Sequence, residues 1–565
     1  MTSTDYDVVI IGAGISGICF AYRLQERNPH LRYCILEGRD DIGGTWSFFK
    51  YPGDAEVTEG LRSDSDLHTF GFPWAPWTEE APIAQGPSIV NYMKRTIAEA
   101  GIDEHIRLNH KVEGLAWSSK RKQWTVKTNV HGNIGEISAR FVLLGTGYYD
   151  YEKGLRAQIP NIEDFGGPVV HPQFWPEDLD YSDKNVVVIG SGATAITLLP
   201  SLTKEARHVT MLQRAPSYIM SVPIKDQLES TIRRYFPRNL AAKLIRLKWI
   251  ITPTLFRAYC LAFPARARKH IQKITQAEIG HDCSLYPNFT PTYNPFEQRM
   301  CLSPDGDFYA ALRSGKASVK TGTIANITDD SIVLTSGEIL HPDIIITATG
   351  LKLQIGGGIP ITIDSQPFHI PHAFVWKGLM FEGCPNLAFS FGYFDASWTL
   401  GVDMSAQLVC KILRQMRLDR VDVVVPELSD VEREQMREEK FLSLSSTYVE
   451  KGKAALPKVG DMGPWRPRRT FLWEWFALRF GGGPLLPLLD NVHNSPIAIN
   501  TAVNLLATST TKGNMRWIRD LAYRSNTLNL NSNAAQQYGI RSAANRLEVN
   551  RALWVSVSEH NYHPY

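Results

Sequence analysis

The sequence predicts an α/β fold with two separate, doubly wound parallel sheets. The first observation is the apolar run Val8–Ile11, which leads into a glycine-rich turn and then an apolar-periodic helix. The second is a repeat of the same order of elements at 184–202. The third is the length of 565 residues, more than one hydrophobic core usually serves. A buried strand, a glycine turn and a helix in this order are typical of Rossmann-like domains, so we expect two of them.

Composition excludes several classes of protein. Hydrophobic residues make up 44% of the chain and charged residues 21%, as in ordinary globular proteins. A formal charge of +3 gives no reason to propose nucleic acid as a partner. The seven cysteines are scattered and never form Cys-x-x-Cys, so we expect no disulfide framework and no metal site. Such cysteines suit a reducing cytoplasm, which is the expected location.

No segment of the sequence is predicted to cross a membrane. The N-terminus has no basic region of the kind that precedes a signal peptide. The most apolar later stretch, Trp249–Phe263, is interrupted by Pro253 and Arg257 and is too short to span a bilayer. It is either a buried helix or a patch that contacts a membrane surface, and burial is the favoured interpretation.

The first glycine turn has the spacing of a dinucleotide-binding site. Gly12 permits the tight turn, Gly14 allows a pyrophosphate to approach the backbone, and Gly17 allows the helix to pack on the strand. The following strand ends at Glu37. An acid at this place hydrogen-bonds an unphosphorylated ribose, so the first domain fits FAD or NAD.

The second glycine turn has a different ligand preference. It carries Gly190 and Gly192, with Ala195 in place of the third glycine, an accepted variant. The next strand ends in Gln213 and Arg214 without an acid. A cation there suits a 2′-phosphate, so we expect NADPH in this half, held by Arg214.

A third motif lies between the two domains. Its residues fit the pattern Phe-x-Gly-x3-His-x3-Trp-Pro at every fixed position: Phe165, Gly167, His171, Trp175 and Pro176. This pattern resembles the fingerprint of flavin-dependent Baeyer–Villiger monooxygenases, and the resemblance extends over residues 6–465. It implies that the motif couples domain movement and cofactor binding rather than touching substrate.

A second segment also resembles this family. Gly44, Thr45 and Trp46 match a signature whose continuation holds an aspartate close to the flavin, and that role passes to Asp64. Seven extra residues, 54–60, precede the recognisable continuation. The insertion either bulges outward without effect or distorts the site. The alternative for Asp64 is a solvated or helix-capping acid.

The resemblance also implies an active-site arginine at Arg299, with Arg313 as the alternative. A guanidinium stays charged and can stabilise a peroxide anion, and Asp64 would tune it. Arg299 could instead form a structural ion pair. Later, Thr349 and Gly350 end a buried strand that resembles the one re-entering the FAD domain.

These motifs divide the chain into four parts. We expect a first FAD-binding segment at 1–155, an NADP-binding domain at 156–330, a second FAD-binding segment at 331–480 and a disordered or loosely docked tail at 481–565. The NADP-binding domain would carry a basic helical insertion at about 224–281. The tail and the 54–60 insertion could both also be errors of the gene sequence.

The resemblance implies an enzyme that uses FAD, NADPH and O2. It would form a flavin C4a-peroxide that converts a ketone to an ester or lactone, and it could also oxygenate sulfur. Two alternatives remain: a flavin-containing monooxygenase acting on nitrogen or sulfur, and an FAD-binding protein inactivated by the 54–60 insertion. A disulfide reductase needs a reactive cysteine pair near the first helix, and none is present there. Peripheral membrane contact remains open.

Overall fold

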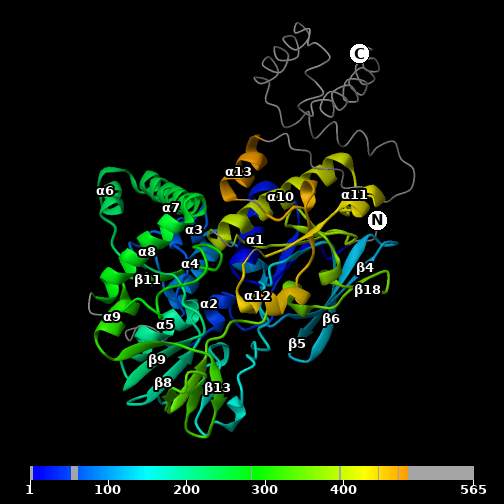
Figure 1. Cartoon of the computed structure of the whole chain (residues 1–565). Coiled ribbons are helices and arrows are strands. Elements are labelled where there is room, and N and C mark those ends of the chain that lie inside the picture. Colours follow the sequence, from blue (N-terminus) through cyan, green and yellow to red (C-terminus); the bar gives the residue numbers. More distant parts are fainter. Residues whose placement is uncertain are drawn as a thin grey trace, which may run out of the picture. The chain divides into compact units, whose positions relative to one another are not determined.

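The computed structural model describes residues 4–52, 61–280, 283–393, 396–442, 444–468 and 470–480 (Figure 1). The expectations for the 54–60 insertion and for the tail at 481–565 therefore fall outside the described residues.

The first sheet is built around the apolar run near the N-terminus. Strand β1 (Tyr6–Ile11) pairs in parallel with a neighbour on each side, and Val8 lies opposite both Tyr33 and Phe141. A strand buried on both faces needs apolar side chains throughout, which explains the continuous run. The other strands of this sheet are β2 (Tyr33–Leu36), β3 (Ile106–Arg107), β4 (Lys111–Ser118), β5 (Gln123–Val130), β6 (Asn133–Leu144), β17 (Ile361–Ile363), β18 (Gln366–Phe368), β19 (Val375–Trp376), β20 (Met380–Phe381) and β21 (Leu387–Phe389).

Helices from both ends of the described chain cover this sheet. The N-terminal and C-terminal segments therefore form one folding unit around it, as the prediction of a divided first domain requires. The helices of this part are α1 (Ile15–Arg27), α2 (Thr45–Phe48), α3 (Leu67–Phe70), α4 (Gly86–Glu99), α10 (Trp398–Asp419), α11 (Asp430–Gln435), α12 (Thr447–Gly452) and α13 (Phe471–Phe480).

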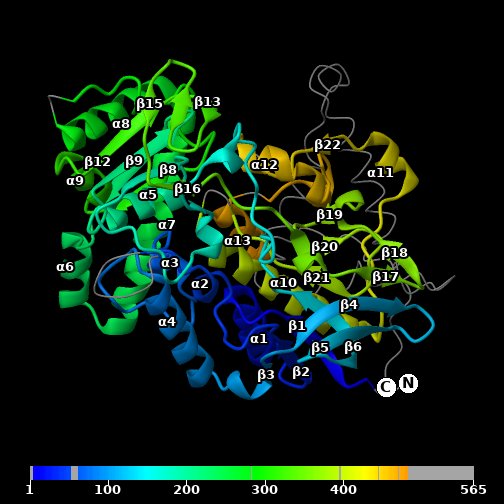
Figure 2. The same ribbon diagram turned by 90° about the horizontal axis from the view of Figure 1, so that it is seen from below.

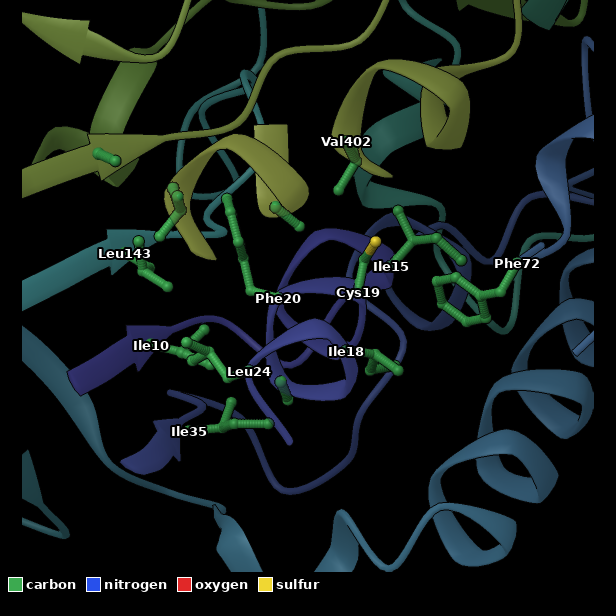
Figure 3. Packing of buried hydrophobic residues seen from close by; sticks show 14 of the residues in the cluster. Ile10, Ile15, Ile18, Cys19, Phe20, Leu24, Ile35, Phe72, Leu143 and Val402 are labelled. Carbon is green, nitrogen blue, oxygen red and sulfur yellow. The ribbon is translucent and has the colours of Figure 1, made fainter. Parts of the chain in front are cut away.

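The core of this part lies around α1 (Figure 3). Phe20 and Leu24 of α1 lie close to Ile10 and Leu143 of the sheet, and all four side chains are almost completely buried. Val402 of α10 lies on another side of α1. Packing of α10 on α1 thus joins segments almost 400 residues apart, which places the glycine turn before α1 in a rigid setting.

The second sheet is parallel throughout, with the order β12-β9-β8-β16-β7 (Figure 2). Its strands are β7 (Val169–Val170), β8 (Asn185–Ile189), β9 (His208–Gln213), β12 (Ala317–Thr321) and β16 (Ile344–Thr347), with α5 (Ala193–Leu202) and α9 (Asp307–Arg313) beside them. Smaller sheets pair β10 (Ile219–Val222) with β11 (Cys301–Pro304), β14 (Ile332–Leu334) with β13 (Ile324–Ile327) and β15 (Ile339–Leu340), and β22 (Glu438–Glu439) with β23 (Val459–Gly460).

The position of β16 differs from the expectation. Its register places Ile344 opposite Val186 and Thr347 opposite Ile189 of β8, so β16 belongs to the second sheet and does not re-enter the first. The expected boundary at residue 330 is therefore too early, and β17 is the first later strand that joins the first sheet. The sequence misled here because every buried parallel strand shows the same apolar run, whichever sheet it joins.

The helical insertion consists of α6 (Gln227–Tyr235), α7 (Arg238–Ala262) and α8 (Pro264–Ile279), which lie together near α3 (Figure 1). The favoured burial of Trp249–Phe263 is wrong for much of α7. Only Ala241, Ile245 and Cys260 of this helix are buried. Among the described residues, no helix is both long and apolar enough to span a membrane.

Candidate active site

The first glycine turn connects β1 to α1, and each of its three glycines has different surroundings. Gly12 has φ of +101°. A Cβ atom on Gly17 would lie 1.9 Å from the carbonyl oxygen of Gly12, so close packing excludes any side chain there. A Cβ atom on Gly14 would meet only the backbone of Gly44, at 3.5 Å, an ordinary contact. Gly14 is thus free of a packing constraint, which leaves the surface over the turn open to a ligand.

The N-terminus of α1 offers donors to such a ligand. Gly14 is its N-cap, no side chain caps it, and its first turn contains no acid. The free N–H groups and the helix dipole favour an anion such as a pyrophosphate.

Glu37 lies beside this turn at the end of β2. Its buried carboxylate accepts hydrogen bonds from the N–H groups of Ala13, at 2.8 Å, and Arg39, at 3.1 Å. The acid is therefore fixed next to the glycine turn, as the ribose-binding role requires.

Gly44, Thr45 and Trp46 face the same turn from the start of α2. The Gly44 carbonyl accepts a hydrogen bond from Arg39, and the Thr45 hydroxyl lies 2.9 Å from the hydroxyl of Tyr151. The Trp46 ring packs edge-on against Phe70, with centroids 5.3 Å apart. A Cβ atom on Gly14 would lie 3.5 Å from the Cα atom of Gly44. The glycine turn at Gly12–Gly17 and the segment Gly44–Trp46 are therefore adjacent.

The second glycine turn has comparable geometry. A Cβ atom on Gly190 would lie 2.2 Å from the Ala348 carbonyl oxygen, whereas one on Gly192 would meet nothing within 4 Å. Ala195 is completely buried, so the alanine in the third position packs well. The N-terminus of α5 is also uncapped and free of acids. The turn thus has room and donors for a second anionic ligand.

Arg214 is the exposed cation at the end of β9. Its guanidinium donates a hydrogen bond of 2.6 Å to the hydroxyl of Thr447 in α12. The neighbouring Gln213 is buried, and its amide donates to Asn288 and Thr321. Gln213 is therefore committed to the fold, and Arg214 is the group at this strand end that can bind a phosphate.

Thr349 and Gly350 follow β16, at the carboxyl edge of the second sheet. The Thr349 hydroxyl oxygen is buried and has no hydrogen-bond partner among the described residues. Gly350 packs against the side chain of Tyr448. Both residues therefore follow a strand of the second sheet, and Gly350 contacts α12 of the first part.

Arg299 and Asp64 form an ion pair, with 3.1 Å between the guanidinium and the carboxylate and each side chain 35% exposed. The segment around Asp64 is fixed, because the Ser63 N–H donates to the Ala84 carbonyl and the Asp66 carboxylate caps α3. The charge of Asp64 raises the pKa of Arg299 above its ordinary value, against the opposing effect of burial. The guanidinium is therefore permanently charged.

Three tyrosines near this pair were not predicted from the sequence. Tyr148, Tyr149 and Tyr448 interact electrostatically with Arg299, and burial raises the pKa of each phenol. The Tyr148 ring stacks on Trp398 of α10, with centroids 4.8 Å apart. Tyr148 and Tyr149 directly follow three small residues, 145–147, that come after the end of β6, and functional side chains gather at such strand ends. That position was the available signal.

Arg313 lies elsewhere. Its guanidinium donates to the carbonyl oxygen of Glu278 and lies 3.6 Å from the carboxylate of the same residue. It does not line the cavity that contains Arg299. Of the two candidates, Arg299 is therefore the one placed at the site.

The fingerprint residues lie in the linker, away from the cavity wall. Phe165 is buried against the second sheet, and Gly167 is next to the start of β7.

The His171 ring accepts a hydrogen bond from the Gln173 N–H at 3.2 Å, and Trp175 packs edge-on against Tyr181. Pro176 is exposed. Burial lowers the pKa of His171. The proposed role in domain coupling stays a prediction.

A cavity of about 1050 Å³ contains Arg299 and Asp64 in its wall. One side is formed by α7, through Trp249, Ile250 and Phe256. Other lining residues come from the C-terminal part of the described chain, including Arg468 and Trp473. The cavity surface is mostly apolar and also carries charged side chains, among them the Arg299–Asp64 pair and Arg468. A mostly apolar cavity with a few polar or charged groups is typical of sites for small molecules.

Comparisons with known proteins agree with this architecture. The family described as pyridine nucleotide-disulphide oxidoreductase matches residues 9–247. The FAD-containing monooxygenase EthA of Mycolicibacterium smegmatis is 43% identical over 84% of this chain and 95% of its own length. The probable FAD-binding monooxygenase AlmA of Acinetobacter baylyi is 40% identical over 85% of this chain and 95% of its own.

Solved structures share the fold. OTEMO in complex with FAD and NADP has a TM-score of 0.62 at 17% identity, covering 85% of this chain and 99% of that one. Cyclohexanone monooxygenase from Rhodococcus sp. Phi1 bound to NADP+ has a TM-score of 0.58 at 18% identity, covering 76% and 87%. The chain therefore belongs to the FAD-containing monooxygenases, a group of flavoprotein enzymes that shares its fold with the Baeyer–Villiger monooxygenases.

Proposed function

We propose that the protein is an NADPH- and O2-dependent Baeyer–Villiger monooxygenase that converts a ketone to an ester or lactone. The observation that carries this proposal is the Arg299–Asp64 ion pair in the wall of a large apolar cavity. The pair forms despite the 54–60 insertion, which argues against a protein inactivated by a distorted site.

The residues present fit both cofactors. The glycine turn at Gly12–Gly17, together with Glu37 and the segment Gly44–Trp46, would hold FAD. The turn around Gly190 and Gly192, with Arg214 at the strand end, would hold NADPH. Bound FAD supplies the redox chemistry and the activation of O2; the protein supplies position, charge and exclusion of water.

Arg299 is the group suited to stabilise negative charge as it develops near the substrate carbonyl. Its charge is fixed, and a partly water-excluded wall strengthens its field. Asp64 orients the guanidinium, and Tyr148, whose ring stacks on Trp398, interacts with it electrostatically. We therefore assign Arg299 as the catalytic residue and Asp64 as its positioning residue.

The test is incubation of the purified protein with NADPH, O2 and phenylacetone, with analysis of products by gas chromatography and mass spectrometry. The reaction balances as ketone, O2, NADPH and a proton giving ester, NADP+ and water. Under 18O2, the proposal expects one labelled oxygen in benzyl acetate. Consumption of NADPH with unlabelled, unchanged ketone and with hydrogen peroxide as the sole oxygen product would refute it.

A parallel incubation with a thioether addresses the alternative of nitrogen or sulfur oxygenation. A protein that forms sulfoxide but no ester from any of a panel of linear and cyclic ketones belongs to that alternative. Formation of both products fits the proposal, since the same cavity and the same charge serve both substrates.

A further inference from the structure

The outer face of the helical insertion is apolar and exposed. Half of the twenty large hydrophobic side chains exposed among the described residues lie within 224–280, although this segment is a small part of the chain. On α7, the exposed side chains recur at helical spacing along one face: Leu240, Leu247, Ile251, Leu255 and Leu261, each 41–64% exposed. We call these five residues the outer α7 face. A monomeric globular protein rarely exposes such a continuous apolar surface without a partner.

The neighbouring helices extend this surface. Leu228, Tyr235 and Phe236 at α6, and Phe263 between α7 and α8, are also exposed. Tyr235 carries an amphipathic ring, which favours a water–lipid boundary, and Phe263 carries an apolar ring of the kind found on the buried face of interfacial helices. The surface therefore continues beyond a single helix.

The helical insertion that carries the outer α7 face is rich in positive charge. Residues 224–280 contain twelve lysines and arginines against three acids, a net charge of +9, whereas the whole chain carries +3. Exposed members of this set include Arg234, Arg238, Lys243, Arg266 and Lys269. This combination of a leucine-rich face and exposed basic residues on the same helices is typical of helices that lie in the interface of an anionic bilayer.

We propose that the helical insertion docks this protein onto an anionic lipid bilayer, with the outer α7 face entering the boundary between headgroups and acyl chains. Nucleic acid is a poorer fit, because phosphate binding needs the basic residues and leaves the leucines without a role. The insertion lies on the bilayer and does not cross it, consistent with the absence of a spanning helix among the described residues.

The insertion is held firmly enough to act as a docking element. Arg246 of α7 donates to the carbonyl oxygens of His68 and Gly71, both at 2.8 Å, and Glu229 of α6 accepts from Lys248 and Trp249. The inner side of α7 is thus fixed to the FAD-binding part, and the exposed leucines are those left over after this packing.

The test is flotation of the full-length protein with vesicles of phosphatidylcholine containing phosphatidylglycerol, and with vesicles of phosphatidylcholine alone. Binding is expected for the anionic vesicles, with a decrease as salt rises. The double variant Leu247→Glu/Leu255→Glu is expected to lower partition at least about tenfold, because each change removes a leucine from the lipid. Neither residue lines the cavity.

Two controls complete the design. Ile134→Glu changes a side chain that is 63% exposed on β6, outside the insertion, and is expected to leave vesicle binding unchanged. Arg234→Glu/Lys243→Glu is expected to reduce binding to anionic vesicles and to flatten its salt dependence. Circular dichroism and melting temperature, which do not depend on catalysis, confirm that each variant is folded.

Other outcomes would overturn the proposal. Equal vesicle binding by the wild type and Leu247→Glu/Leu255→Glu would place the contact elsewhere, and no binding to either vesicle would exclude a lipid partner. Self-association of the wild type that is abolished by the same double variant, without vesicle binding, would assign the face to a second copy of the chain. Because flotation needs neither NADPH nor substrate, failure of the proposed enzymatic function leaves this test intact.

Discussion

Gly14 and Gly17 lie in one turn but differ in what a methyl group would meet. At Gly17 it would overlap the Gly12 carbonyl oxygen at 1.9 Å, whereas at Gly14 it would meet only Gly44 at 3.5 Å. We predict that Gly17→Ala lowers the melting temperature or prevents folding. Gly14→Ala should fold normally and lose bound FAD, because the methyl group occupies the surface over the turn. Flavin absorbance per protein, together with thermal melting, separates the two effects; equal loss of stability in both variants would contradict the assignment.

The Arg299–Asp64 ion pair is expected to contribute directly to activity. Arg299→Ala should lower the rate of oxygenated product formation by about 10²–10³, the usual cost of removing a group that stabilises developing charge. Asp64→Asn should cost less, about tenfold, and Arg299→Lys should restore part of the activity lost in Arg299→Ala. Product is measured at saturating NADPH, with FAD content as the control. Unchanged activity in Arg299→Ala would leave the ion pair with a structural role only.

Arg214 is the residue expected to bind the 2′-phosphate of NADPH. Arg214→Ala should raise the KM for NADPH about tenfold or more, because a charged hydrogen bond to the 2′-phosphate is lost. The KM for NADH, which lacks that phosphate, should stay the same. Thr447→Val is the matched control, since it removes the partner of Arg214 and retains the guanidinium. A parallel rise of both KM values would point to a folding defect instead.

At the scale of elements, the attachment of α6 and α7 depends on Glu229. Burial opposes its charge, but the His68 ring, 3.2 Å from the carboxylate, and the hydrogen bond from Lys248 outweigh this and hold its pKa at about 2, below the ordinary 4.5. Because the folded pKa is depressed, the ionised carboxylate stabilises the fold fully above pH 4.5. This stabilisation is lost as the pH falls from about 4.5 to about 2.

We therefore predict that Glu229→Gln lowers the free energy of unfolding at pH 7 by about 3 kcal/mol, the range for a broken buried pair. Hydrogen exchange should increase first in α6 and α7. The control is Glu177→Gln, whose side chain is 81% exposed in its pair with Lys50, with an expected cost below about 1 kcal/mol. Equal effects of the two substitutions would mean that Glu229 does not anchor the insertion.

The elements also show how far the sequence could be interpreted. Periodicity and turn residues were sufficient for β1, α1 and the insertion, because each depends on local spacing. The sheet to which β16 belongs could not be predicted, since an apolar run records burial and not the neighbouring strand. The exposure of Leu255 and Leu261 was missed for a related reason: an apolar side chain carries the same letter whether it is buried or left on the surface.

Only some residues of the candidate site could be predicted from the order of the elements. The glycine turns, Glu37 and Arg214 follow strands, and their place follows from the strand–turn–helix order. Tyr448 comes from a segment about 150 residues after Arg299, and only the three-dimensional fold brings the two together. The same holds for the cavity wall near Trp473.

At the scale of the whole molecule, the residues around Asp64 connect the two sheet-containing halves. Arg62 pairs with Asp307 of α9 and donates to the Leu302 carbonyl oxygen in β11. We predict that Arg62→Ala lowers product formation about tenfold by displacing Asp64 from Arg299, with more NADPH consumed per product. The ratio of NADPH oxidised to ester formed measures this effect. Arg32→Ala, a control at a side chain 60% exposed, should leave the ratio unchanged; a normal ratio in Arg62→Ala would separate the ion pair from catalysis.

The division of α7 into two faces has a consequence for how this protein can diverge. Trp249, Ile250 and Phe256 line the cavity, whereas Leu247, Ile251 and Leu255 belong to the outer face. Ile250 and Ile251 are neighbours in the sequence, yet the Ile250 side chain lines the cavity and the Ile251 side chain lies on the outer face. Point mutations within α7 can therefore alter the accepted substrate without altering the outer surface, or the reverse. Natural selection can thus adjust the two traits independently.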